Sequence, residues 1–511
     1  MRQTRRTRGL RYALLSLLTL PLLQACTNLG PDYQEPPVEW VADWETSLYG
    51  QVSATDLEEE DLAFWWQAFE DPILNTLIES ARQENQALRI AALNIVQSRA
   101  ILGIATGTQY PQLQRANGTW TRVDSWPTEG ENDWDRSGFN TYNLGFDIGW
   151  ELDFWGRYRR SIESADATFF ASITNQQDAQ VLLTAQVAET YYTWRTLALQ
   201  IEIAKENAAL QERSLEITTT LYDSGQNSEL DVQQARTQYL GTLSTIPSLE
   251  ISLRQVENAL SVLLGRQPGD LPELAGLTPA LPTLDPVLID DIPARLLMRR
   301  PDIRTAAWQI AAQSAQIGVA EADLYPSISL FGTIGWSGDS FGNTNDALST
   351  GVGPGFTWNL FNYGRLENNV RVQDALLEQA IEGYELTVLQ AAREIDDAAI
   401  SVVKTREQQD ILEESLASAR RALDISTRRY REGYSDFQRV LDAQRALAAS
   451  SNNFVAIQGA HINSVVGFYK ALGGGWQTVS GEDLLPVETR ERMEERSDWD
   501  GLLQAPLPLT E

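Results

Sequence analysis

Histidine and cysteine, the usual side chains of zinc sites and of nucleophile pairs, are scarce in this sequence. Its 511 residues include one histidine, His461, and one cysteine, Cys26. A zinc site needs several such ligands, and a Cys/His nucleophile pair needs both groups side by side in the fold. No phosphate-binding glycine motif and no Gly-x-Ser-x-Gly motif lies between a strand and a helix. We therefore expect no enzyme activity, no cofactor and no metal, and a packed core position for His461.

The cysteine follows a segment that is typical of bacterial export signals. Five arginines precede residue 12, and the apolar stretch 13–23 is too short to span a bilayer as a permanent helix. The segment ends in LLQAC, which resembles a bacterial lipobox. We expect residues 1–25 to be removed and Cys26 to carry covalent lipid such as palmitate, and Thr27 favours sorting to the outer membrane. An ordinary buried cysteine is the alternative.

The chain is strongly acidic. It has 40 Lys and Arg against 70 Asp and Glu, a net charge of −30. Removal of residues 1–25, which hold five arginines and no acid, changes this charge to −35. Such a surface repels nucleic acid and anionic lipid. We therefore expect no nucleic-acid partner.

One long internal repeat divides the chain. GWELDFWGR at 149–157 aligns with TWNLFNYGR at 357–365, an offset of 208 residues. Upstream, GIATGTQYPQLQ aligns with GVAEADLYPSIS, which places Tyr110 opposite Tyr325 at an offset of 215. A repeat of this length is far longer than a solenoid unit. It indicates two similar halves, at 64–270 and 287–475, joined by a linker at 271–286.

Each half is predicted to contain three helices. The first ends before a Tyr-Pro pair, because proline blocks continuation of a helix. The second is much longer, since its two copies contain no proline and a single glycine, Gly383. A return helix follows. The predicted ranges are 71–110, 157–224 and a return to about 264 in the first half, and 287–325, 365–432 and a return to about 472 in the second.

Two glycines mark the turns between the long helices and the return helices. Gly225 and Gly433 fit left-handed helix stops, and Ser228 with Asp231 resembles a capping box for the first return helix. Apolar residues spaced alternately by three and four positions predict coiled-coil seams with small side chains. These seams are Val181, Ala185, Ala188 and Tyr192, and Val388, Ala392, Ile395, Ala399 and Val402.

Strands are predicted between the first and second helix of each half. From Tyr142 to Phe154 an apolar residue occupies every second position, which predicts a strand with one apolar face. Strands of roughly ten residues with tryptophan and phenylalanine on that face suit a tilted membrane strand. A soluble sheet with one face on a core is the alternative. The predicted strands are 112–123, 139–153, 327–337 and 350–360.

A membrane sheet cannot leave an edge unpaired, and four strands are too few to close a barrel. We therefore expect a homotrimer whose copies together form a 12-stranded β-barrel. The predicted fold is mainly α, a long α-helical barrel with a small membrane β-barrel. Residues 26–63 are expected to form a lipid-anchored tether, and 476–511 an acidic C-terminal tail that is partly disordered.

Three segments resemble one family. WWQAFEDPILNTLIESARQENQALRIAALNIVQSRA (65–100), LLMRRPDIRTAAWQIAAQSAQIGVAEADLYPSISL (296–330) and YREGYSDFQRVLDAQ (430–444) are similar to signatures of TolC/OprM-type outer membrane factors, in the NodT-like lipoprotein branch. The resemblance implies a trimeric exit duct with a long periplasmic extension. It also implies two partners, a periplasmic membrane-fusion adaptor and an inner-membrane transporter, often of the resistance-nodulation-division (RND) type, for the export of drugs, metals or other small molecules.

The same resemblance implies a gate at the periplasmic tip. By position, Asp231 and Tyr430 resemble an aspartate and a tyrosine that bond to each other across the closed tip. Asp442 resembles an acidic residue that faces the lumen, and Asp436 lies near a gate aspartate. The alternative for each aspartate is a solvated residue or a helix cap.

Several alternatives remain open at this point. Gly225 and Gly433 are candidate adaptor contacts, or they serve only the backbone geometry of the turns. An uncoupled diffusion channel is the rival function, and a lipid-anchored periplasmic coiled-coil protein is another. The sequence does not identify the exported substrate.

Overall fold

A computed structural model describes residues 28–38, 62–125, 137–269, 271–282, 297–339 and 347–508, so Cys26 lies outside the described residues. The chain divides into two compact units. Unit 1 comprises 1–37, 95–172 and 305–384, and unit 2 comprises 38–94, 173–304 and 385–511. The helices α4 (Gln86–Gly107), α5 (Arg157–Asp223) and α9 (Arg365–Arg431) each contribute residues to both units.

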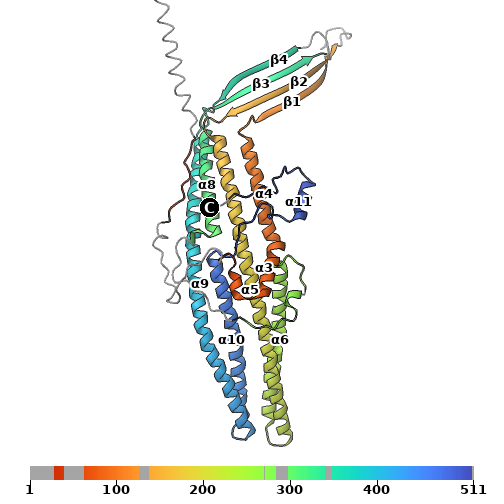
Figure 1. The fold of residues 1–511 in the computed structure, drawn as a ribbon, viewed down its shortest axis with the longest axis vertical. Helices are drawn as coiled ribbons and strands as arrows, with labels where there is room; N and C mark the ends of the chain where they lie inside the picture. Colours follow the sequence, from red (N-terminus) through yellow and green to blue (C-terminus); the bar gives the residue numbers. More distant parts are fainter. Residues whose placement is uncertain are drawn as a thin grey trace, which may run out of the picture. The chain divides into compact units, whose positions relative to one another are not determined.

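Unit 1 contains one antiparallel sheet in the order β1-β2-β3-β4 (Figure 1). Its register pairs Trp120 with Tyr142, Phe146 with Ile334, and Ile328 with Phe356, so these residues share one face. The four predicted strands are confirmed to within a few residues. Their bounds are β1 (Leu113–Ser125), β2 (Ser137–Leu152), β3 (Ser327–Gly338) and β4 (Ala347–Thr357).

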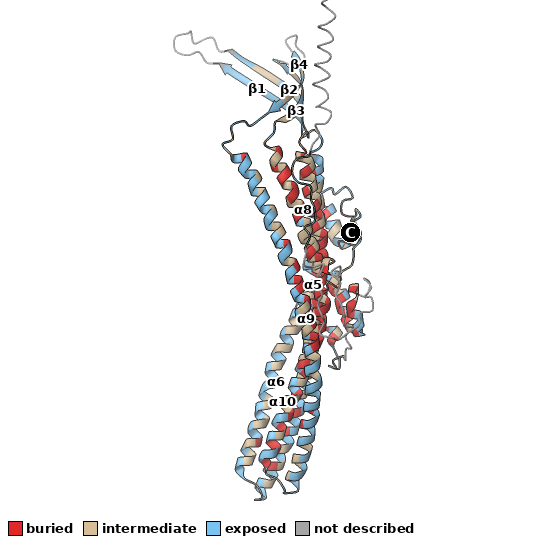
Figure 2. Cartoon of the chain, turned by 90° about the vertical axis from the view of Figure 1, so that its left-hand side faces the viewer, coloured by how far each residue is buried: buried red, intermediate tan, exposed pale blue. Residues whose placement is uncertain are grey.

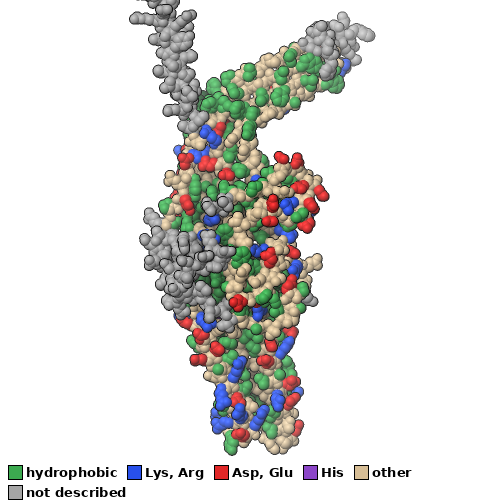
Figure 3. All heavy atoms as spheres, in the orientation of Figure 1, with side chains coloured by type: hydrophobic (Ala, Val, Ile, Leu, Met, Phe, Trp, Pro, Cys, Tyr) green, Lys and Arg blue, Asp and Glu red, His purple; other side chains and the backbone are tan. Residues whose placement is uncertain are grey.

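The apolar face of this sheet is exposed in the single chain, and Figure 3 shows hydrophobic side chains gathered over the strands. Trp358 and Leu360 were assigned to the fourth strand, and that prediction is wrong because β4 ends at Thr357. The Trp358 indole Nε1 instead donates to the Leu324 carbonyl, 3.0 Å away, which ties the segment after β4 to the segment before β3. The exposed apolar side chains that share this face are Trp120, Leu144, Phe146, Ile148, Trp150, Leu330, Ile334, Leu348, Val352 and Phe356.

The helices of unit 1 lie in the order α4, α5, α8 (Pro301–Ala322), α9 (Figure 1). The Arg99 guanidinium of α4 lies over the Phe169 ring of α5, 5.3 Å from its centroid. Between α8 and α9, the Gln313 amide donates to the Gln373 side chain at 2.9 Å. Helices α4 and α8 have 22 residues each, and α5 and α9 have 67 residues each. The duplicated halves therefore have helices of equal length.

The first helix of each half differs from its prediction. Residues 71–110 form two helices, α3 (Pro72–Glu84) and α4, because Asn85 is extended. Its side chain accepts from the Leu88 amide at 3.0 Å and donates to the Leu263 carbonyl at 2.9 Å, which satisfies backbone groups at two helix ends. In the second half, helix α8 begins at Pro301, a residue suited to the first helical position. The predicted start at 287 lies outside the described residues.

Unit 2 contains two helical hairpins. Hairpin one joins α5 to α6 (Glu229–Leu263), and hairpin two joins α9 to α10 (Phe437–Ala471). Exposed residues predominate near the ends of both hairpins (Figure 2). Helix α6 continues through Pro247. The predicted seams are confirmed, because each of their residues is buried: Val181, Ala185, Ala188, Tyr192, Val388, Ala392, Ile395, Ala399 and Val402.

Both hairpins turn at a left-handed glycine, as predicted. The backbone φ is +71° at Gly225 and +77° at Gly433. After Gly225, the Gln226 amide donates to the Leu221 carbonyl at 2.8 Å, and after Gly433, the Tyr434 amide donates to the Arg429 carbonyl at 2.9 Å. These bonds satisfy carbonyls that the helix end leaves free.

The C-terminal residues are more ordered than expected. Residues 476–508 include helix α11 (Val487–Glu494), and Leu485, Met493 and Leu503 are buried. The prediction of partial disorder is therefore wrong for these residues. Apolar burial explains the difference, because a composition rich in acids hid a few well-placed apolar side chains.

Near the start of unit 2, the buried Trp65 stacks on Tyr469 at 5.3 Å between ring centroids.

A buried arginine joins three helices of unit 2. The Arg300 guanidinium donates to Asp302 at 2.8 Å, to Glu394 of α9 at 2.8 Å, and to the Ala471 carbonyl of α10 at 2.7 Å. Asp178 of α5 lies close to this network. Burial raises the pKa of Asp178 to about 6, with Asp302 and Glu394 also raising it while Arg300 and Lys470 lower it.

Asp178→Asn should stabilise the protein at pH 7.5 and lose this advantage as the pH falls to about 4. A folded pKa above the ordinary value of 3.8 means that the ionised form opposes folding, so stability from this group is full at low pH and declines as pH rises towards 6. The expected gain at pH 7.5 is about 2 to 3 kcal/mol, since one pKa unit corresponds to roughly 1.4 kcal/mol. Thermal unfolding between pH 4 and 8 measures it.

The matched control is Glu206→Gln on the exposed surface of the same helix, which should change stability by less than about 0.5 kcal/mol at any pH. A gain for Asp178→Asn that does not vary with pH would contradict the assignment.

Candidate functional site

Two regions bring together the residues singled out in the sequence. One is the pair of hairpin ends, residues 217–237 and 425–445 of unit 2. The other is the sheet–helix junction of unit 1, formed by 28–32, 108–112, 150–163 and 316–326.

At the hairpin ends, a hydrogen bond joins hairpin one to hairpin two. The Asn227 amide donates to the Tyr430 hydroxyl oxygen at 2.9 Å. The Tyr430 ring packs on the buried Phe437 at 5.3 Å between centroids. Burial raises the pKa of Tyr430, with a smaller contribution from the charge of Asp231. The phenol therefore stays protonated and holds its place between the two turns.

The structure brings only some of the predicted gate residues together. Asp231 and Tyr430 line the same cavity of about 450 Å³, but within the described chain the Tyr430 hydroxyl bonds to Asn227 and not to Asp231. Asp436 precedes α10 as its N-cap residue and lies 3.7 Å from Arg439. Asp442 accepts from Gln438 at 2.9 Å and is exposed.

Sequence reasoning missed Asn227. An asparagine within QNSELD reads as an ordinary turn residue, and its partner lies 203 positions away in the other half. The internal repeat gives no help, since Asn227 corresponds to Ser435 at the offset of 208. Ser228 does cap α6 by accepting from the Leu230 amide at 3.1 Å, as expected of an N-cap.

The sheet–helix junction is organised by a buried arginine, Arg160. The side chain of Arg160, near the start of α5, is only 2% exposed. Its guanidinium donates to the Leu29 carbonyl at 2.8 Å, to the Gly30 carbonyl at 3.0 Å and to Asp32 at 2.7 Å. A fourth bond at 2.8 Å reaches Glu163. One side chain thus fixes the segment that begins three residues after Cys26.

Close backbone contact explains why glycines occur here. A Cβ on Gly30 would lie 2.5 Å from the Gly318 Cα of α8, and Gly30 has a φ of +81°. A Cβ on Gly318 would lie 2.4 Å from the Leu29 carbonyl oxygen. Residues 28–32 therefore lie in a groove between α5 and α8 that only glycines leave open. The predicted irregular tether is bound along this part.

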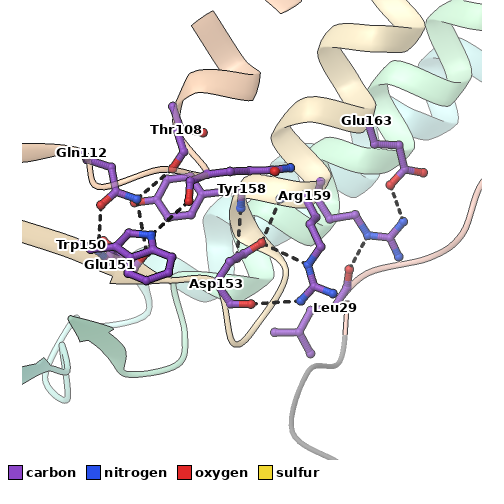
Figure 4. Close-up of polar contacts among 11 residues, drawn as sticks. Leu29, Thr108, Gln112, Trp150, Glu151, Asp153, Tyr158, Arg159 and Glu163 are labelled. Carbon is purple, nitrogen blue, oxygen red and sulfur yellow. Dashed lines mark hydrogen bonds and ion pairs between the residues drawn. The ribbon is translucent and has the colours of Figure 1, made fainter. Parts of the chain in front are cut away.

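The same junction connects the strands to the helices. Asp153 accepts from the Tyr158 amide at 3.2 Å and the Arg159 amide at 3.0 Å, which satisfies free N–H groups at the start of α5 (Figure 4). The Trp150 indole donates to the Gln109 carbonyl at 3.0 Å. The sheet and the helices of unit 1 are thus held by directional bonds.

The remaining candidate residue, His461, is packed inside the protein. His461 is buried, and its Nδ1 lies 3.0 Å from the Thr405 hydroxyl. Burial lowers the pKa of His461, so the ring is neutral at physiological pH. Among the residues that the structure describes, no group of three or more His, Cys, Asp or Glu side chains could hold a metal ion.

Comparison with known proteins identifies a family. A family model described as outer membrane efflux protein matches residues 77–266 and 292–474. SrpC, a solvent efflux pump outer membrane protein of Pseudomonas putida, is 32% identical over 478 residues, which cover 91% of this chain and 99% of SrpC. SilC of Salmonella typhimurium, a probable outer membrane lipoprotein, is 29% identical over 479 residues, covering 91% of this chain and 98% of SilC.

A solved structure extends this similarity to the fold. The outer-membrane channel OprN superposes with a TM-score of 0.77 at 30% sequence identity. The alignment covers 88% of this chain and all of the OprN chain.

Arg160→Ala should release residues 28–38 from their groove. The substitution removes three charge-assisted hydrogen bonds to that segment. We expect the free energy of unfolding to fall by about 2 to 4 kcal/mol. Limited proteolysis followed by mass spectrometry should show new cleavage within 28–38, and thermal unfolding should occur at lower temperature.

Arg393→Ala is the control, because Arg393 and its partner Asp397 are both largely exposed and 3.8 Å apart. Such a pair contributes about 0.5 kcal/mol or less. Equal protease resistance of Arg160→Ala and the wild type would show that Arg160 does not hold the segment.

Proposed function

Because this chain belongs to the outer membrane efflux protein family and is an outer membrane efflux channel, we propose that it works as a homotrimer, the exit duct of a tripartite pump. Its partners in this proposal are a periplasmic adaptor and an inner-membrane transporter of the RND type. Small molecules pass from these partners through the duct to the exterior. The transporter supplies the energy and selects the substrate.

The observation that carries the proposal is the pair of free sheet edges. β1 and β4 are the outer strands, and among the described residues each pairs with one neighbour only. Lipid offers no hydrogen-bond partner for free backbone groups, so a membrane sheet has to close on itself. Known barrels start at about eight strands. Three copies of this sheet give a closed wall in which β4 of each copy pairs with β1 of the next.

Exposed apolar residues on the hairpins of unit 2 support the same assembly. On α6 they are spaced by ten or eleven residues, which places them within an arc of about 80° at roughly 100° per residue. On α9 the corresponding arc is about 60°. Such stripes on soluble helices require cover. The stripes are Leu230, Leu240, Ile251 and Val262 on α6, and Leu386, Leu389, Ile411 and Ile425 on α9.

The uncoupled diffusion channel is the less favoured function. A channel that only crosses the membrane needs no hairpins with helices of 67 residues, about 100 Å at 1.5 Å per residue. A coiled-coil protein without a channel would not need a sheet with an exposed apolar face. Lipid on Cys26 fits the proposal, since Leu29 is held three residues further on, within about 10 Å of chain.

A gate at the hairpin ends completes the proposal. The Asn227–Tyr430 bond ties hairpin one to hairpin two, so separation of the hairpins has to break it. The exposed turns at Gly225 and Gly433 are the surfaces that an adaptor would reach first. Adaptor binding would then favour the separated state.

The purified, lipidated protein should be a conducting trimer. Light scattering in detergent should give three times the chain mass after subtraction of the detergent. Planar bilayers should show channels of low conductance, because the hairpin ends are closed at rest. A stable monomer, or a trimer that never conducts, would refute the proposed duct.

Tyr430→Phe and Asn227→Ala should each raise single-channel conductance. Each removes a bond worth about 1 kcal/mol, and three copies that open together would shift the closed-to-open ratio by roughly 100-fold. The double variant should exceed neither single one, because both remove the same bond. Asp231→Ala should have a smaller effect.

Tyr434→Phe, an exposed tyrosine in the same turn, is the matched control and should leave conductance unchanged. Additive effects of the two substitutions would count against a shared bond.

A further inference from the structure

The internal repeat provides a template for contacts between copies. Within the chain, repeat one meets repeat two at the α5–α8 boundary of unit 1. There the Trp155 ring stacks on Tyr325 at 4.7 Å between centroids, and its indole donates to the Pro326 carbonyl at 2.8 Å. Lower on the same boundary, the Gln316 amide donates to the Ser164 hydroxyl at 2.7 Å. We name this set the in-chain boundary.

The opposite edges of unit 1 have no such neighbour in the part of the chain that the structure describes. The helix order is α4, α5, α8, α9, and the strand order is β1, β2, β3, β4 (Figure 1). The start of α9 is thus the repeat-two equivalent of the start of α5, and α4 is the repeat-one equivalent of α8. An α9–α4 contact between two copies would repeat the in-chain boundary.

The residues at these edges match the template. At the offset of 208, Tyr363 corresponds to Trp155, and at the offset of 215, Tyr110 corresponds to Tyr325. Gly364, after Tyr363, has a φ of +79°, and the equivalent Gly156 has a φ of +77°. Both glycines therefore adopt the left-handed conformation, whereas the preceding residues differ, because Tyr363 has a φ of +55° and Trp155 is not among the described non-glycine residues with positive φ. Yet Tyr363 is 99% exposed and Tyr110 is 65% exposed.

A second pair of positions points the same way. Ser164 and Gln316 of the in-chain boundary correspond to Val372 on α9 and Ile101 on α4. Val372 is 53% exposed and Ile101 is 43% exposed. A polar pair that meets inside the chain is thus replaced by two apolar side chains that each lack cover.

We propose that the Tyr363 ring of one copy stacks on Tyr110 of the neighbouring copy, and that Val372 packs against Ile101 of that copy. This inference rests on the proposed trimer and assigns the residues that join its copies. Aromatic stacking and apolar burial supply the attraction.

The contact between copies is less polar than its template. In the chain, Arg157 of α5 pairs with Asp323 at 3.6 Å, and Arg160 binds the N-terminal segment in the α5–α8 groove. Arg365 is the equivalent of Arg157, and Thr108 is the equivalent of Asp323. Asn368 is the equivalent of Arg160. None of these can form the same ion pair, so the boundary between copies depends on apolar and aromatic contact.

Lipid is the competing occupant of these edges. Tyrosine is frequent at membrane interfaces, and α4 is long and apolar enough to cross a membrane by length and composition alone. Phe361 separates the two possibilities, because it is highly exposed and its repeat-one equivalent, Asp153, bonds to the Tyr158 and Arg159 amides of its own half. We therefore expect Phe361 to stay accessible when the copies assemble.

The test is cross-linking of the assembled protein. Tyr110→Cys combined with Tyr363→Cys should give covalent dimers and trimers with a short bis-maleimide, and neither single variant should. Tyr110→Cys with Phe361→Cys is the matched control and should cross-link at least tenfold less. Ile101→Cys with Val372→Cys is an independent second pair. In the trimer, Tyr363→Cys should resist a water-soluble maleimide that labels Phe361→Cys.

The outcomes separate the two proposals. A trimer in which neither cysteine pair cross-links, or in which Tyr363→Cys and Phe361→Cys label equally, overturns the boundary while leaving the duct intact. Labelling of Tyr363→Cys by a lipid-soluble maleimide in the trimer assigns the edge to lipid and also overturns it. Absence of a trimer in the wild type would instead refute the proposed function.

Discussion

The requirement that every backbone N–H and C=O in lipid be paired underlies the trimer proposed for this protein. The described residues make a sheet of four strands, β1 to β4, and none of them pairs with its outer edges. Water would leave the apolar face of that sheet exposed to an unfavourable solvent. Lipid would leave the backbone groups at its free edges unpaired in a single copy. Both conditions are met when copies of the sheet close into one wall. The helices attached to the strands must then follow the same rotational symmetry, since α4 and α8 lead into strands, and α5 and α9 follow strands, through short segments fixed by bonds such as that from Trp150 to Gln109.

Duplication explains how one chain can meet this requirement. A ring that repeats every half chain needs only one type of boundary, used alternately within a copy and between copies. The equal lengths of α4 and α8, and of α5 and α9, preserve that geometry. The two boundaries nevertheless differ in chemistry. The in-chain boundary has the Arg157–Asp323 pair and the Arg160 cluster, whereas the edges between copies present Tyr110, Ile101, Tyr363 and Val372.

The parts of this structure that could be predicted from sequence are those controlled by local periodicity. Alternation predicted the strands, the absence of proline predicted α5 and α9, and the glycine positions predicted both turns. Long-range polar contacts could not be predicted in this way. The break at Asn85 depends on the carbonyl of Leu263, the bond between the hairpin ends joins Asn227 to Tyr430 across 203 positions, and the Arg160 cluster holds a segment 131 residues away. From the local sequence alone, Asn85 fits a helix interior, Asn227 fits a turn and Arg160 fits an exposed arginine.

The division of chemistry between the two boundaries has a physical reason. Contacts within a chain form at high effective concentration, so directional bonds that need exact geometry, such as the four from Arg160, can be made as the unit folds. Contacts between copies form by encounter, and a charged group left unpaired at such an edge would be costly in lipid. Apolar and aromatic side chains avoid that cost in the separate copy and still gain free energy when the edge is covered, because their attraction does not depend on orientation as a hydrogen bond does. An acidic chain that assembles beside a membrane is therefore expected to form its ion pairs inside the copy and to meet its neighbours mainly through aromatic and apolar side chains.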